Sequence, residues 1–133
     1  MRSFMPVTAA CRRLCEVTVM NDLLLFPHQK LDAYSLSREL AVGVRAARIA
    51  HAELRDQAER ASVSVFLALN EGLPHSSTKM RAQYFLRAKA SLCELVGALD
   101  LARELGVLDD RVGRELHAIA ARVAAIIVGL LRR

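Results

Sequence analysis

The stretch QAERASVSVFLALNEG, Gln57–Gly72, decides how this chain folds. It has helical spacing, and it places small and polar residues where a helix normally buries Leu or Val. A second stretch, SLCE at Ser91–Glu94, repeats this pattern inside a long amphipathic segment. A helix that gives up apolar area at core positions needs close backbone approach or a specific polar contact. The two stretches therefore indicate helices that meet through small and polar side chains.

The composition favours an all-α fold. The 133 residues suffice for one domain with one continuous core. Hydrophobic residues make up 53% of the chain but aromatic residues only 5%, and the dominant residues, Ala and Leu, are good helix formers. Three Pro and six Gly are too few for the many turns of an all-β protein.

The first long helix is expected to begin near Asp32, an N-cap candidate. A tight turn is expected somewhere in Arg48–Asp56, because Asp56 and Glu59 have the spacing of a capping box at the start of a second helix. The alternative is one unbroken helix from Asp32 to Asn70, which would bury its small-residue face against another chain. The expected buried positions of the first helix are Leu36, Leu40, Gly43, Ala47 and Ala50.

Clear stop and start signals delimit the remaining helices. The second helix is expected to end at Gly72, because Gly followed closely by Pro74 is a typical stop. The third runs from caps in Ser76–Thr78 to about Leu105, and the fourth begins at Asp110. The expected inward positions are Phe85, Ala88, Leu92, Leu95, Leu99 and Ala102, then Leu116, Ile119, Val123, Ile126 or Ile127, and Leu130. Helices joined by short links predict an up-down-up-down antiparallel four-helix bundle.

Residues 1–27 differ in character from the rest of the chain. We interpret them as an N-terminal extension, which either forms a short helix around Ala9–Met20 or is partly disordered. The bundle domain then covers residues 28–133.

The cysteines and the apolar runs indicate the compartment. Cys11, Cys15 and Cys93 are an odd set without paired metal spacing, which predicts reduced thiols in a cytoplasmic protein. The longest uncharged apolar run, Val123–Leu131, is too short to span a bilayer.

Three motifs together carry a family resemblance. They are LDAY at Leu31–Tyr34, QAERASVS at Gln57–Ser64, and AxxSLxEL at Ala88–Leu95 with LDLARELG at Leu99–Gly106 behind it. With these motifs the chain from about Leu31 to Leu131 resembles the small bacterial four-helix bundle family of 23S ribosomal RNA intervening-sequence proteins. It departs from the family pattern at Phe66, usually Pro, and at Ala68, usually Asn.

The resemblance implies a fold and a context, but no reaction. The family lacks an assigned activity, and some members are encoded inside intervening sequences of large ribosomal RNA genes. A related bundle is the accessory protein of the reverse transcriptase in diversity-generating retroelements. Characterised relatives resemble homopentamers with positively charged surfaces. The implied partners are therefore further copies of the chain, up to a pentamer, together with RNA, DNA, a reverse transcriptase or another protein.

Polar residues on the second and third helices form two stripes with helical spacing. They are Gln57, Arg60, Ser64 and Glu71 on the second helix, and Arg87, Ser91 and Glu94 on the third. We interpret them as a polar seam whose hydrogen bonds and ion pairs fix the register of the helices. The alternative makes Glu71 and Glu94 the paired acids of a site.

The formal net charge of +5 is compatible with contact to nucleic-acid phosphates as well as with an ordinary solvated surface. Candidate phosphate contacts are Arg38, Arg45, Arg48 and Arg55 around the first helix, and Lys79, Arg81, Arg87 and Lys89 on the third. Aromatic residues are scarce, so we expect contact with the backbone of a nucleic acid rather than sequence-specific recognition of single strands.

No pattern of residues predicts catalysis or metal binding. His51 and His117 stand two residues from Glu53 and Glu115, which is the wrong spacing for a di-iron site. Arg45 and His51 match the Arg-to-His spacing of helical ribonucleases that resemble toxin components, which leaves RNA cleavage as a remote alternative. We therefore expect a non-enzymatic, homo-oligomeric, nucleic-acid-associated or accessory protein without cofactor or metal. The main alternative is a protein–protein interaction module that binds no nucleic acid.

Overall fold

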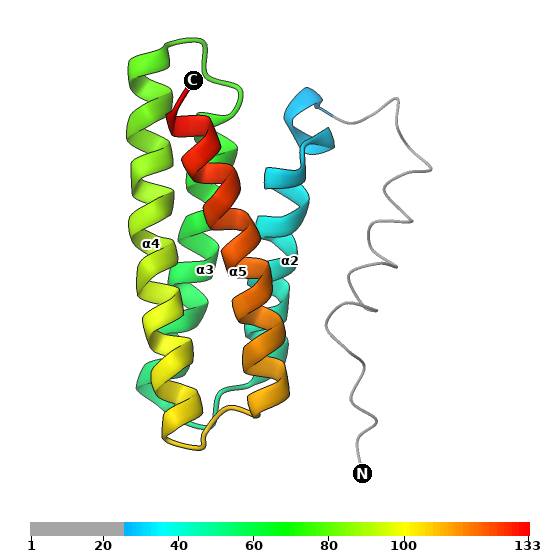
Figure 1. The fold of residues 1–133 in the computed structure, drawn as a ribbon, viewed down its shortest axis with the longest axis vertical. Helices are drawn as coiled ribbons and strands as arrows, with labels where there is room; N and C mark the ends of the chain where they lie inside the picture. The colour runs from blue at the N-terminus through cyan, green and yellow to red at the C-terminus, as the bar shows by residue number, and fades with distance from the viewer. Residues whose placement is uncertain (1–25) are drawn as a thin grey trace.

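The helices run up and down along a common axis (Figure 1). The structure is a computed structural model, and it describes residues 26–133. The elements are η2, a short 3-10 helix (Pro27–Lys30), α2 (Asp32–Ala47), α3 (Ala52–Gly72), α4 (Thr78–Glu104) and α5 (Asp110–Leu131). The predicted all-α, up-down-up-down antiparallel four-helix bundle is confirmed. The helix considered around residues 9–20 lies outside the described part.

The break between α2 and α3 depends on one residue in an unusual backbone conformation. Arg48 follows the last residue of α2 and adopts the left-handed conformation with φ 48°. A residue other than Gly is rarely found there, because its Cβ crowds the backbone. The next residue, Ile49, is 1% exposed and packs in the core. Burial of the Ile49 side chain thus holds the strained turn in place, and a single helix from Asp32 to Asn70 is ruled out.

The first turn of α3 is capped by a histidine. The Nδ1 atom of His51 accepts a hydrogen bond from the Leu54 amide at 3.3 Å, so α3 begins at Ala52. The capping-box signal at Asp56 is therefore wrong as a helix start, although the turn falls within the expected interval. An imidazole nitrogen performs here the role that Asp, Ser or Thr usually has at an N-cap.

The α2–α3 and α4–α5 turns lie side by side at one end of the bundle (Figure 1). The Ala50 amide donates a hydrogen bond to the Val107 carbonyl at 2.9 Å, which links the two turns directly. Gly106, at φ 70°, allows the chain to leave α4, and the Asp109 carboxylate caps α5 by accepting from the Val112 amide at 3.2 Å.

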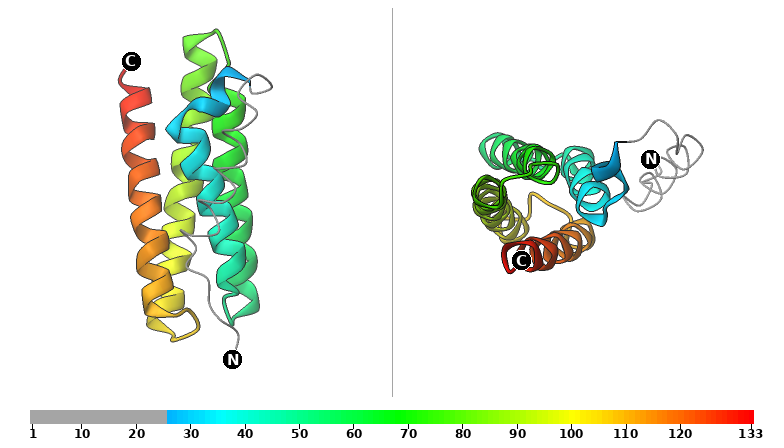
Figure 2. Two further views of the ribbon diagram at one scale, coloured as in Figure 1. Left: turned by 90° about the vertical axis from the view of Figure 1, so that its right-hand side faces the viewer. Right: turned by 90° about the horizontal axis from the view of Figure 1, so that it is seen from above.

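At the opposite end α3 and α4 approach each other closely. A Cβ atom on Gly72 would lie 2.8 Å from Cβ of Tyr84 and 3.0 Å from the Phe85 ring, so only glycine fits there. η2 and the C-terminus lie at this same end (Figures 1 and 2).

The core follows the predicted helical periodicity. All six inward positions expected on α4 are buried, as are Leu116, Ile119, Val123 and Ile127 on α5. On α2, Leu36, Leu40 and Gly43 are buried, whereas Ala50 is exposed because the helix has already ended. α3 and α4 share the most extensive interface, and both helices bury alanines: Ala58, Ala61 and Ala68 on α3, and Ala88, Ala98 and Ala102 on α4. No helix in the described part of the chain is long and apolar enough to cross a membrane.

Candidate nucleic-acid interface

Charged side chains are distributed unequally along the bundle axis. We call the end with η2, the α3–α4 loop and the C-terminus the basic end; its half of the bundle comprises residues 31–40, 63–90 and 121–133. It contains eight Lys and Arg but three acidic residues, Asp32, Glu39 and Glu71. The eight are Arg38, Lys79, Arg81, Arg87, Lys89, Arg122, Arg132 and Arg133.

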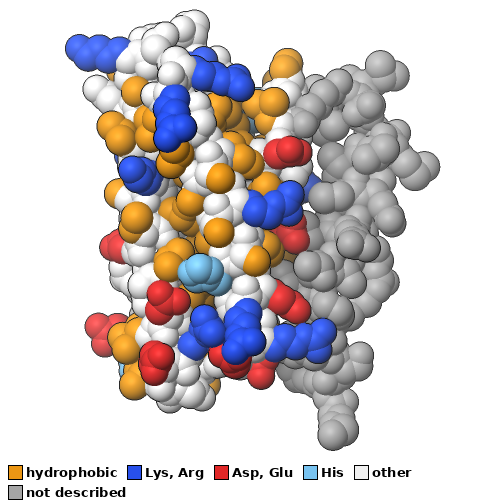
Figure 3. Space-filling model, viewed as in Figure 1, with side chains coloured by type: hydrophobic (Ala, Val, Ile, Leu, Met, Phe, Trp, Pro, Cys, Tyr) orange, Lys and Arg blue, Asp and Glu red, His pale blue; other side chains and the backbone are white. Residues whose placement is uncertain are grey.

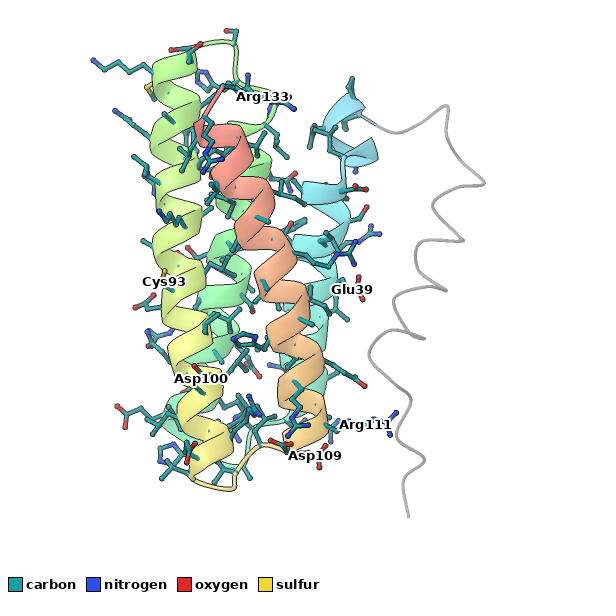
Figure 4. The ribbon with its side chains drawn as sticks, viewed as in Figure 1. Glu39, Cys93, Asp100, Asp109, Arg111 and Arg133 are labelled. Atoms are coloured by element: carbon teal, nitrogen blue, oxygen red, sulfur yellow. The ribbon has the colours of Figure 1, made fainter. Side chains whose placement is uncertain are left out.

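The turn end is the other half, residues 41–62 and 91–120. It contains seven Arg and nine Asp or Glu. On the α4 and α5 side of the surface in Figure 3, the acidic side chains lie toward this end. Figure 4 shows the same contrast along α5, with Asp109 and Arg111 at its start and Arg133 at the far end.

Several cations at the basic end have no ion-pair partner. Among residues 26–133, the structure contains no salt bridge for Lys79, Lys89, Arg122, Arg132 or Arg133. The ion pair of Arg87 with Glu71 is long, 3.9 Å, and both side chains are more than half exposed. Such a pair is weak in water. The positive charge at this end is therefore largely uncompensated.

Most arginines at the turn end are paired. Arg45 bonds Glu59 at 3.1 Å, and Arg103 and Arg114 each approach Asp110 at 2.9 Å. The hydrogen bond from Arg103, helped by the charge of Arg114, holds the pKa of the Asp110 carboxyl below its usual value.

The predicted phosphate contacts divide between the two ends. Arg45, Arg48 and Arg55 lie at the turn end, and Arg55 donates to the Ile49 carbonyl at 3.3 Å. Arg48 and Arg55 do not share a helical ridge, because the turn separates them. The other expected contacts, Arg38, Lys79, Arg81, Arg87 and Lys89, belong to the basic end. Sequence reasoning missed Arg122, Arg132 and Arg133, which join this group only when α5 returns antiparallel to α4.

The charges at the start of α4 run against the usual preference of a helix N-terminus. The first turn carries Lys79 and Arg81 and no acidic residue, whereas the last turn carries Arg103 beside Glu104. Because the helix dipole favours anions at the N-terminus, cations there cost about 0.3–1 kcal/mol each. Stability of α4 alone therefore does not explain why cations gather at its N-terminal end.

The polar seam residues meet across the α3–α4 interface in the following way. Gln57 donates to Glu94 at 2.9 Å, and the hydroxyl groups of Ser64 and Ser91 are 2.8 Å apart. Arg60 donates to Gln57 within α3 at 3.0 Å and does not bridge to a carboxylate of α4. Together with the Arg87–Glu71 pair, the Gln57–Glu94 and Ser64–Ser91 bonds connect the antiparallel helices α3 and α4 at three successive levels along the bundle.

The residues considered for an acid pair, for RNA cleavage and for a metal site are placed as follows. Glu71 lies beside Arg87 of α4, whereas Glu94 is on α4 itself, seven residues further along. Seven residues span about 10 Å of a helix, so the two carboxylates do not form a pair. The Nδ1 atom of His51 is engaged as the α3 cap, and Arg45 pairs with Glu59. In residues 26–133, no group of three or more His, Cys, Asp or Glu residues has a geometry suited to a metal ion.

A shallow groove lies beside the middle of the polar seam. It has a volume of about 500 Å³, and α3 contributes the apolar side chains Val63 and Leu67, which are 47% and 50% exposed. Glu59, Glu71 and Arg87 also line it.

Comparison with known proteins identifies the family. The sequence profile described as 23S rRNA-intervening sequence protein matches residues 29–129. A comparison with curated proteins finds no match. The profile match covers all of α2, α3 and α4 and most of α5, so it includes both ends of the bundle. The chain therefore belongs to the 23S rRNA-intervening sequence protein family.

Proposed function

We propose that this protein is a non-enzymatic, nucleic-acid-associated protein that contacts phosphates through its basic end. The observation that carries the proposal is the excess of eight Lys and Arg over three acidic residues in that half. The family's connection with ribosomal RNA intervening sequences supports RNA as the nucleic acid.

The side chains of the basic end have the properties that phosphate contact requires. Five of the cations have no salt bridge with any other described residue, so they can bind phosphate without first losing a carboxylate partner. Arg offers a planar fork for bidentate contact, whereas Lys acts as a point charge. Each phosphate neutralised releases counterions, so affinity falls as salt rises.

Assembly into a homo-oligomer, up to the pentamer that the resemblance implies, is part of the proposal. A symmetric assembly would bring several basic ends into one surface and multiply a modest charge into a strong field. The apparent mass in solution, measured by light scattering with and without RNA, tests this part independently. A monomer under all conditions would contradict it.

Two charge-reversal variants with the same net charge test the proposed interface. One is Lys79→Glu/Arg122→Glu/Arg132→Glu at the basic end, and the matched control is Arg45→Glu/Arg111→Glu/Arg114→Glu at the turn end. We expect the first to lose at least about tenfold in RNA affinity by fluorescence anisotropy, with a flatter salt dependence. Equal losses in both variants would show that only the net charge matters. Absence of any salt-dependent binding at low salt would refute the proposal.

The non-enzymatic part has its own test. RNA recovered after long incubation with the protein should be intact by gel electrophoresis. Cleavage that disappears in His51→Ala, in a variant whose helical content is unchanged, would instead support the ribonuclease alternative.

The groove beside the polar seam favours a second candidate, a protein–protein interaction module. Val63 and Leu67 are half exposed in a concave site with charges at its rim, a composition suited to a partner protein. A reverse transcriptase is the partner that the family resemblance suggests. Leu67→Asp should then abolish co-purification of one stoichiometric protein and leave RNA affinity unchanged.

A further inference from the structure

Aromatic side chains are confined to the basic end of the bundle. Within residues 26–133, Tyr34, Phe66, Tyr84 and Phe85 lie in the basic half as defined above, and the remaining Phe, Phe26, precedes η2 at the same end. The core at the turn end is built from aliphatic side chains instead. Rings and uncompensated cations therefore occur together, although the sequence shows only that aromatic residues are few.

Four rings form a continuous series from the α2–α3 interface outward. Phe66 on α3 contacts Tyr34 on α2, with ring centroids 5.3 Å apart. Tyr34 meets His28 edge-on at 5.9 Å, and His28 stacks on Phe26 at 6.1 Å with an angle of 25° between the rings. η2 is what aligns the two outer rings, because Phe26 and His28 flank its first residue.

The outermost ring is poorly buried. Phe26 is 67% exposed, the largest value among the exposed large hydrophobic residues of residues 26–133. A Phe side chain that contributed to the core would bury most of its ring. Phe26 does not gain this stabilisation, so its placement calls for an explanation outside the core.

A second pair of rings lies on the other side of α3. His75, in the α3–α4 loop, is 6.0 Å from Tyr84, and the Arg87 guanidinium lies 5.6 Å from the Tyr84 ring centroid. Arg38 lies in the same way over Tyr34, at 5.3 Å. Each Tyr thus has a cation close to its ring, so rings and positive charge occur side by side at this end.

From this juxtaposition we infer that the basic end binds single-stranded nucleic acid, with unpaired bases stacked on the Phe26–His28–Tyr34 series and phosphates held by the surrounding cations. The inference rests on the proposed function and adds the class of strand. Aromatic rings stack on any base, because every base has a π-face, whereas the bases of a duplex are already stacked on each other. The site therefore discriminates strandedness and not sequence.

Three probes of equal phosphate number separate stacking from charge. They are a short fluorescein-labelled single-stranded RNA, a duplex of half that length, and an abasic strand that keeps the phosphates but lacks the bases. We expect the full-length chain to bind the single strand at least about fivefold more tightly than the abasic strand, since stacking on one ring contributes about five- to 150-fold.

Phe26→Leu is the matched variant, because it keeps an apolar side chain and removes the ring. The control is Leu105→Ala, at an apolar position of the turn end that is also more than half exposed. We expect Phe26→Leu to lose at least about fivefold for the single strand and to bind the abasic strand unchanged. His28→Ala should have the same effect, and Leu105→Ala none. Unchanged helical circular dichroism will verify that each variant is folded.

The outcomes distinguish this inference from the proposed function. Equal, salt-dependent affinity for all three probes, with no loss in Phe26→Leu, would overturn the stacking site and leave phosphate binding intact. No binding of any probe would overturn both. A loss in Phe26→Leu that is equally large for the abasic strand would also count against stacking, because that strand has no base to lose.

Discussion

The two ends of this bundle contain the same four helices but differ in chemistry. At the turn end, arginines pair with carboxylates, the α2–α3 and α4–α5 turns are joined by a backbone hydrogen bond, and the core is aliphatic. At the basic end, Lys79, Lys89, Arg122, Arg132 and Arg133 have no salt bridge with any other described residue, and the Phe and Tyr rings of residues 26–133 gather there. The turn end is therefore held together by its own ion pairs and backbone hydrogen bond, whereas the basic end exposes cations and an aromatic ring to solvent.

The largest effect is expected from the core beneath the basic end. Phe85 is 2% exposed and lies against Gly72, so Phe85→Ala should lower the free energy of unfolding by about 3–5 kcal/mol. Urea denaturation measures this loss. Leu86→Ala, at the neighbouring exposed position, should change stability by less than about 0.5 kcal/mol. Comparable losses of unfolding free energy in the two variants would mean that the core at the basic end is not tightly packed.

The next effect tests the seam that connects the two ends. The hydroxyl groups of Ser64 and Ser91 meet at 2.8 Å between α3 and α4. A double-mutant cycle with both residues changed to Ala should give a coupling free energy of about 0.5–1.5 kcal/mol. If the two substitutions are simply additive, this contact does not hold the helices in register.

A smaller effect, of opposite sign, is expected at the turn end. Arg48 has φ 48°, a conformation that glycine adopts without steric cost. Arg48→Gly should raise the free energy of unfolding by about 0.5–1 kcal/mol and leave RNA affinity unchanged. Arg48→Val, which keeps a branched Cβ in the left-handed region, should be destabilising instead. A large loss of RNA affinity in Arg48→Gly would show that the turn end also binds RNA, which would contradict the assignment of RNA binding to the basic end.

The smallest effect concerns the pairing of charges at the turn end. Because Arg103 and Arg114 hold the pKa of Asp110 below its usual value, folding favours the ionised carboxyl. This stabilisation is present at neutral pH and is lost as the pH falls through the range in which Asp110 takes up a proton. Asp110→Asn should therefore be less stable than the native chain at pH 7, and the difference should shrink as the pH falls below the usual pKa of an Asp carboxyl. A difference that persists unchanged in acid would point to a cause other than ionisation.

Much of the fold could be predicted from the sequence, because helical periodicity reports burial directly. Gly72 with Pro74 marked the end of α3, and the inward positions of α4 were all identified. The start of α3 was missed, because a histidine is a rare N-cap and Arg48 gives no turn signal. Neither residue type reveals its conformation without the buried Ile49 that fixes it.

The candidate interface could be predicted only in part. Lys79 and Lys89 were identified as basic residues of one predicted helix, but Arg122 and Arg132 lie on or directly after another helix that returns to the same end. Phe26 and Tyr84 are far apart in sequence and come to one end only through the antiparallel order of the helices. Such a site depends on tertiary arrangement, which a count of charges or rings along the chain does not contain.

The hydrogen bond from the Ala50 amide to the Val107 carbonyl has a consequence for hydrogen exchange. Both groups lie in turns, so no helix protects this amide from solvent. Its exchange with deuterium requires the α2–α3 and α4–α5 turns to separate, even if every helix remains intact. The protection factor of the Ala50 amide therefore measures how firmly the two turns are joined, separately from fraying of individual helices.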